Sequence, residues 1–131
     1  MGLLAVLVAA AGGFAAGAVW YMTLAKPWLA AAGFELGPDG KPTKSNGMWP
    51  FLVAAIAMIL VAGMMRHIFA MAGLDGPGQG LVAGLGIGAF FITPWVAMNY
   101  AYAARPVQLT VIDGGYSILG CAVIGLVLGL F

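Results

Sequence analysis

Four long apolar stretches constrain the fold of this chain more than any other feature of its sequence. A membrane-spanning helix needs about 20 consecutive, mostly apolar residues. Four ranges meet this requirement: residues 2–25, 48–72, 79–103 and 107–130. Prolines lie between them, and proline interrupts a helix because it lacks the amide proton that continues the hydrogen-bond ladder. We therefore predict an all-α integral membrane bundle of four helices, which forms a single domain over residues 1–131.

The composition excludes a water-soluble monomer and several kinds of functional site. Of the 131 residues, 63% are hydrophobic and only 7% are charged, whereas soluble domains carry about 25% charged residues. The net charge of +1 excludes a basic nucleic-acid-binding protein. The single cysteine, Cys121, and the single histidine, His67, exclude an internal disulfide and a cluster of Cys or His metal ligands. We predict the lipid bilayer as a partner, with no metal, cofactor or nucleic acid.

Loop lengths and basic residues predict the topology. The loop of residues 26–47 is the only long one, and the two short turns favour antiparallel neighbours in an up-down-up-down order. Both termini then lie on one side. Four basic residues lie on the other side, with the first and third connections: Lys26, Lys41, Lys44 and Arg105. Only Arg66 lies toward the termini, so the positive-inside rule places both of those connections in the cytoplasm and the termini outside. The expected location is the bacterial cytoplasmic membrane.

The two halves of the chain share a short pattern. Tyr21 lies five residues before a Lys-Pro pair, and Tyr100 lies five residues before an Arg-Pro pair. An Asn-Gly or Asp-Gly pair with a later aromatic residue follows in each half: Asn46-Gly47-Met48-Trp49 and Asp113-Gly114-Gly115-Tyr116. One interpretation is a duplicated helical hairpin. The other is that aromatic residues, a cation and a helix-ending proline recur at any membrane boundary.

Small residues recur at every fourth position in three of the predicted helices, and this spacing permits close helix contact in a membrane. These residues are Ala9, Gly13 and Gly17; Gly80, Gly84 and Gly88; and Ser117, Cys121, Gly125 and Gly129. One interpretation is tight packing inside the bundle, where Cys121 serves as a small apolar residue. The alternative is that one row forms an oligomer interface or flexes during gating. Because four short helices cannot hide every row from lipid, we predict a homo-oligomer or a larger membrane complex.

A group of polar and aromatic residues is predicted near the cytoplasmic end of the bundle. Asp113 lies six residues into the fourth helix, about 9 Å from the third connection at 1.5 Å per residue. Residues at a similar depth, or flanking it, complete the candidate site: Trp20, Tyr21, Trp49, Asn99, Tyr100 and Tyr116, beneath the interfacial cations Lys26 and Arg105. A charged side chain inside a span is costly, so it is a functional hypothesis by default.

Asp113 has three interpretations. It fixes the helix register by accepting hydrogen bonds from Tyr21 or Asn99 and pairing with Arg105 or Lys26; it binds a ligand, proton or ion; or it contacts another subunit. A second polar site lies near the other end of the second helix, where Arg66 and His67 are adjacent. We expect Arg66 to reach the headgroups and to pair with Asp75. Ligation of haem by His67 in a symmetric dimer is a further alternative. In the third helix, Pro94 predicts a kink, with Thr93 bonding the freed carbonyl.

Several short motifs have the order and spacing of a known family. They are Gly17-Ala18-Val19-Trp20-Tyr21, Lys26-Pro27-Trp28, Asn99-Tyr100 with Arg105-Pro106, and Ile112-Asp113-Gly114-Gly115-Tyr116. Outside the first loop, the chain resembles an uncharacterised bacterial family of small four-helix membrane proteins, known only as a domain of unknown function. Members often carry Ser-Pro after the Trp-Tyr pair, where this chain has Met22-Thr23, so a turn imposed by that proline is not implied here. The resemblance implies the four-helix fold and no particular activity.

The sequence contains no recognisable catalytic arrangement. Paired carboxylates, a Ser-His-Asp set and a phosphate loop after a strand are all missing, and the glycine-rich run of residues 84–88 lies inside a predicted span. We therefore predict a non-enzymatic membrane protein, which is an accessory or structural subunit or a self-associating bundle. The alternative is a small transporter or channel with a polar site around Asp113 and Asn99. Whether Asp113 faces a hydrated cavity or a neighbouring helix distinguishes these functions.

Overall fold

The fold consists of long apolar helices packed side by side. The computed structural model describes residues 2–44 and 47–131. In these residues the helices are α1 (Gly2–Thr23), α2 (Ala25–Ala32), α3 (Trp49–Ala72), α4 (Pro77–Ile87), the π-helix η1 (Gly88–Ile92), α5 (Thr93–Tyr102) and α6 (Val107–Gly129). Because α4, η1 and α5 run on without a break, four helices are long and apolar enough to cross a membrane. The predicted all-α bundle of four such helices is confirmed.

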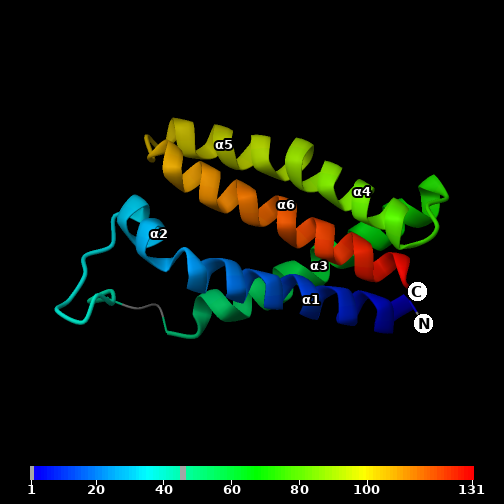
Figure 1. The fold of residues 1–131 in the computed structure, drawn as a ribbon, viewed down its shortest axis with the longest axis horizontal. Helices are drawn as coiled ribbons and strands as arrows, with labels where there is room; N and C mark the ends of the chain where they lie inside the picture. Colours follow the sequence, from blue (N-terminus) through cyan, green and yellow to red (C-terminus); the bar gives the residue numbers. More distant parts are fainter. Residues whose placement is uncertain (1, 45–46) are drawn as a thin grey trace.

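The four spans alternate in direction, as Figure 1 shows. Both ends of the chain lie at one end of the bundle, together with the turn between α3 and α4 (Figure 1). The short helix α2 and the turn between α5 and α6 lie at the opposite end. We call these the terminal end and the loop end of the bundle. This arrangement is the up-down-up-down order that the loop lengths predict.

The boundary between the first helix and the first loop differs from the prediction. The first span ends at Thr23 rather than at residue 25, and residues 25–32, which we assigned almost entirely to the loop, form α2. The prediction treated Pro27 as the end of a helix, but a proline in the first turn of a helix sacrifices no hydrogen bond. Gly33 then ends α2 in the left-handed region, with φ of 80°.

The third span contains a widened turn. The span begins at Pro77, two residues before the predicted start. The π-helix η1 interrupts its α-helical course just before Pro94. The Thr93 hydroxyl lies 2.7 Å from the Gly88 carbonyl oxygen and 3.1 Å from that of Gly114. The kink expected at Pro94 therefore takes the form of a π-helical turn, with the Thr93 hydroxyl sharing its one proton between the turn and α6.

Helix α6 forms the centre of the bundle. It contacts α1, α2, α3, α4, η1 and α5, and Figure 1 shows it between the α4–α5 span and α1. The core consists of small and aliphatic residues together with one aromatic ring: Ala5, Ala9, Ala10, Ala62, Met65, Phe69, Cys121, Ile124 and Leu128. The buried residues of α3 are Ala62, Met65 and Phe69, so this helix packs closely only in its second half.

The glycine row of α4 and the small-residue row of α6 face each other. A Cβ atom at Gly80 would lie 2.1 Å from the Gly125 carbonyl oxygen, and one at Gly84 would lie 2.1 Å from the Cys121 carbonyl oxygen. The other members at this contact are Gly88, Ser117 and Gly129. Only glycine permits this approach, in which the backbones of two helices touch without intervening side chains.

The small-residue row of α1 also faces the inside of the bundle. Ala9 is fully buried in the core. A Cβ atom at Gly13 would lie 2.9 Å from Cδ1 of Ile124, and one at Gly17 would lie 2.7 Å from the hydroxyl of Tyr116. These glycines therefore receive large side chains of α6, whereas Gly80 and Gly84 of α4 meet its backbone.

Candidate functional site

A single carboxylate connects three elements to α6 near the loop end. Asp113 accepts a hydrogen bond of 2.6 Å from the Tyr21 hydroxyl and one of 3.0 Å from the Trp28 indole, both at Oδ1. The Tyr100 hydroxyl donates to Oδ2 at 2.5 Å. These donors come from α1, α2 and α5, so Asp113 holds all three elements against α6.

The backbone of α6 beside Asp113 is hydrogen-bonded as well. The Trp20 indole donates to the Ile112 carbonyl at 2.9 Å, and the Ser117 hydroxyl donates to the Asp113 carbonyl at 3.0 Å. Gly115 makes room for the indole, because a Cβ atom there would lie 2.7 Å from Cζ2 of Trp20. The Asp-Gly-Gly sequence thus combines an acceptor side chain with a surface that is open to an aromatic neighbour.

Aromatic rings surround the hydrogen bonds to the carboxylate. Tyr21 meets Trp28 edge to face at a centroid distance of 5.9 Å and meets Tyr116 in the same way at 5.4 Å. Trp28 also lies against Phe34, at 5.5 Å. The Tyr116 hydroxyl donates to the Gly13 carbonyl at 2.8 Å. Each such ring pair stabilises the fold by about 0.5–1.5 kcal/mol beyond the burial of its surface. Neighbouring rings therefore help to hold the donors to Asp113 in place.

Among the described residues, the hydrogen bonds to the Asp113 carboxylate do not come from Asn99 or from the two interfacial cations. Asn99 is exposed on α5, and Trp49 is 65% exposed at the start of α3. Lys26 is also exposed, and the Arg105 guanidinium donates to the Ala32 carbonyl at 2.6 Å. The three hydrogen bonds to the Asp113 carboxylate come from neutral donors, and Arg105 fixes the end of α2 instead.

The structure adds one donor that sequence reasoning missed. Trp28 lies in a segment that we assigned to the first loop, so no helical depth was counted for it. One sequence signal for Trp28 is its place in the Lys26-Pro27-Trp28 motif, which lies only a few residues after Tyr21. An aromatic residue just beyond the end of a span folds back when the chain starts a second helix there, as α2 does.

The residues of the pattern shared by the two halves of the chain do not all occupy equivalent places in the structure. Its two tyrosines, Tyr21 and Tyr100, converge on the same carboxylate. Of the aromatic residues in the second part of the pattern, Tyr116 is half-buried and Trp49 is exposed. Asn46, the counterpart of Asp113, lies outside the described residues.

A groove lies beside this site, between α1 and the first half of α3. Its volume is about 510 Å³, and its lining includes Phe14, Ala18, Phe51 and Ala54 together with the rings of Tyr21 and Tyr116. The hydroxyls of both tyrosines are used in hydrogen bonds with Asp113 and Gly13. The groove therefore offers mainly apolar surface.

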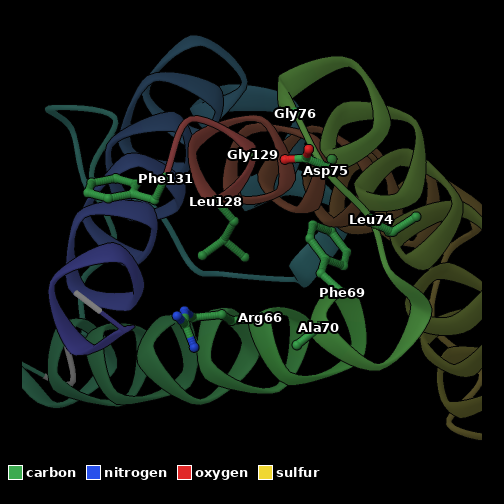
Figure 2. Close-up of a pocket in the computed structure, with 10 residues that line it drawn as sticks. Arg66, Phe69, Ala70, Leu74, Asp75, Gly76, Leu128, Gly129 and Phe131 are labelled. Carbon is green, nitrogen blue, oxygen red and sulfur yellow. The ribbon is translucent and has the colours of Figure 1, made fainter.

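The second predicted polar site lies at the terminal end. Arg66 and His67 are both exposed on the second half of α3. Arg66 and Asp75, which we expected to pair, line the same pocket from opposite sides (Figure 2). Within residues 2–44 and 47–131, no three or more His, Cys, Asp or Glu side chains are grouped so that they could hold a metal ion.

Fold and composition define the class of this protein. The described residues contain four helices that are long and apolar enough to span a membrane, which makes this a multi-pass helical membrane protein. The chain belongs to the family described as Protein of unknown function (DUF1761), whose family model matches residues 4–129. This match confirms the resemblance to an uncharacterised family. No match is found among curated proteins or among solved structures.

Proposed function

We propose that this protein is a non-enzymatic structural or accessory subunit of the membrane, in which Asp113 locks the loop end of the bundle. The observation that carries the proposal is the set of donors around the carboxylate. Tyr21, Trp28 and Tyr100 approach it from three separate elements. Asp113 faces neighbouring helices in this arrangement, which is the geometry expected for a residue that fixes helix register.

The energetics favour the same function. A hydrogen bond to a charged group contributes about 1.5–3 kcal/mol, and each buried donor that loses its acceptor costs about 1–3 kcal/mol. Three such bonds offset much of the cost of keeping a charge inside a span. A carboxylate that exchanges ions during transport must release its partners in each cycle, which would break all three bonds together. The arrangement supports hydrogen bonds to Asp113 that stay formed, rather than bonds that break in each transport cycle.

The outer surface supports association with other membrane-embedded molecules. None of the residues of α5 is buried, and Trp95 of this helix and Phe91 of the adjoining η1 are each 67% exposed. The proposed surroundings are the bacterial cytoplasmic membrane, with both connections at the loop end in the cytoplasm. The positions of Lys26 and Arg105 at that end support this orientation. The proposed partner is a homo-oligomer or a larger membrane complex.

The test combines gentle native mass spectrometry with variants at Asp113. We expect the protein, released from its own membranes, to appear in a complex of fixed stoichiometry. Asp113→Leu should lose that complex and unfold at a lower temperature than Asp113→Asn, which keeps one acceptor oxygen. A monomer that retains a small molecule would contradict the proposal. So would an Asp113→Asn protein that keeps its fold and its complex but loses an ion or solute flux in proteoliposomes, because the carboxylate charge would then serve transport.

A further inference from the structure

A pocket at the terminal end places two opposite charges across a small apolar space. It has a volume of about 210 Å³ and lies between the second half of α3, the turn into α4 and the end of α6. Figure 2 shows Arg66 rising from α3 on one side and Asp75 in the turn on the other, with the side chains of Phe69 and Leu128 between them.

The two charged groups of this pocket make no ion pair with each other among the described residues, so both are available to a ligand. In the part of the chain that the structure describes, neither the Arg66 guanidinium nor the Asp75 carboxylate has a hydrogen-bond or ion-pair partner. The Asp75 backbone N–H donates to the Gln79 side chain at 2.7 Å, which fixes the turn. The guanidinium lies against Gly2, because a Cβ atom there would be 3.1 Å from Cζ of Arg66.

The depth of the pocket matches the headgroup layer. Arg66 lies six residues before Ala72, the last residue of α3, or about 9 Å from the end of the helix. A long cationic side chain at this depth reaches toward the interface, and Asp75 lies beyond the helix end, in the turn. The pocket therefore extends from the edge of the apolar layer into the polar layer.

The chemistry of the pocket selects one class of ligand. A guanidinium binds a phosphate through two parallel N–H···O bonds, while a carboxylate accepts hydrogen bonds from a primary ammonium group. Phe69, Leu128 and Phe131 add apolar walls that suit the start of a lipid chain. We propose that this pocket binds a zwitterionic phosphoethanolamine headgroup, which the surrounding bilayer supplies as phosphatidylethanolamine.

This assignment distinguishes between common headgroups. Phosphatidylglycerol carries the phosphate but has no cation for Asp75. Phosphatidylcholine carries a cation that has no N–H to donate, because its nitrogen bears three methyl groups. The pocket should therefore prefer the primary amine to both of them, and the preference should fall along the series of mono-, di- and trimethylated amines.

The test measures which lipid stays with the protein. Full-length protein is placed in nanodiscs that contain equal amounts of phosphatidylethanolamine, phosphatidylglycerol and phosphatidylcholine, and the lipids retained after release are counted by native mass spectrometry. We expect phosphatidylethanolamine to be enriched about tenfold, the effect expected from one charge-assisted hydrogen bond. The methylated series in the same assay leaves the protein unchanged, so its outcome does not depend on how any variant folds.

Two variants assign the charges. Asp75→Asn should remove the preference for the primary amine but keep phospholipid retention, whereas Arg66→Gln should lower the retention of all three lipids. Glu35→Gln and Lys44→Gln are the controls, since these exposed residues lie in the loop at the opposite end, and they should change nothing. Equal retention of the amine and its trimethylated form, or an unchanged preference in Asp75→Asn, would overturn the proposal. Free phosphoethanolamine is added in a separate sample, and its retention without any preference among the three lipids would overturn the bilayer as its source.

Discussion

The contact between α4 and α6 makes a quantitative prediction for a pair of neighbouring glycines. A Cβ atom at Gly84 would lie 2.1 Å from the Cys121 carbonyl oxygen, whereas one at Gly86 would meet no heavy atom of the described residues within 4 Å apart from its own stretch of helix. Both residues lie in α4, so Gly84→Ala and Gly86→Ala make the same chemical change in the same helix. We expect only the first to weaken the bundle.

The size of the effect follows from the distances. Ordinary van der Waals contact begins at 3.4 Å, so alanine at position 84 forces the two helices apart by about 1.3 Å, the difference from 2.1 Å. Overpacking of this kind costs about 1–3 kcal/mol, and each neighbouring Cα–H···O interaction that breaks adds about 0.5–1 kcal/mol. The higher helix propensity of alanine offsets up to about 1 kcal/mol of this destabilisation. The net destabilisation at Gly84 is about 2 kcal/mol, while Gly86→Ala is neutral or slightly stabilising.

The single cysteine provides the assay. Cys121 is buried in the core, and its carbonyl oxygen lies at this contact, so a maleimide reaches its thiol only when the packing around α6 opens. A change of about 2 kcal/mol in the opening equilibrium raises the alkylation rate about 30-fold. Gly84→Ala should show this increase in mild detergent, and Gly86→Ala should match the unmodified protein. Equal rates in the two variants would refute the close contact, as would a faster reaction in Gly86→Ala alone.

Three further predictions concern single side chains, each measured by thermal unfolding in detergent. Thr93→Val removes the hydroxyl that bonds η1 to α6 and should cost about 1 kcal/mol; an unchanged unfolding temperature would contradict the bonded turn. Tyr116→Phe removes the bond to the Gly13 carbonyl and should cost a similar amount, whereas Tyr102→Phe, at a residue 90% exposed, should cost nothing. Gly33→Ala should cost about 1 kcal/mol because φ there is 80°, and a stabilised variant would argue against the left-handed cap.

The length and order of the spans could be predicted because they depend on properties that add along the chain. Apolar residues must continue for the thickness of a bilayer, and that requirement is visible in the sequence without any knowledge of contacts. Helix α2 has only eight residues and gives no such signal. Its existence depends on tertiary contacts, among them the bond from Trp28 to Asp113 and the bond from Arg105 to Ala32.

For the candidate site, the sequence predicts the depth of each residue along its span but not the side of the helix that its side chain faces. Counting residues at 1.5 Å each gives the level of a side chain along a span, and this placed Tyr21, Tyr100 and Asp113 near one another. Successive residues on a helix also turn by about 100°, so Asn99 and Tyr100 cannot both face the same point. Tyr100 faces α6 and bonds Asp113, and Asn99 is therefore exposed. Which of two neighbours turns inward depends on how the helices rotate against each other.

The two ends of the bundle are held together by different interactions, and this difference predicts uneven unfolding. Toward the terminal end, glycine backbones of α4 and α6 touch directly, and these contacts do not involve Asp113. At the loop end, three elements depend on that one carboxylate. Asp113→Leu should therefore open the loop end alone. Tryptophan fluorescence, to which Trp20 and Trp28 contribute, should change in mild detergent, while alkylation of Cys121 should stay as slow as in the unmodified protein. Rapid alkylation in this variant would show instead that the two ends unfold together, and Asp113 would then hold the whole bundle.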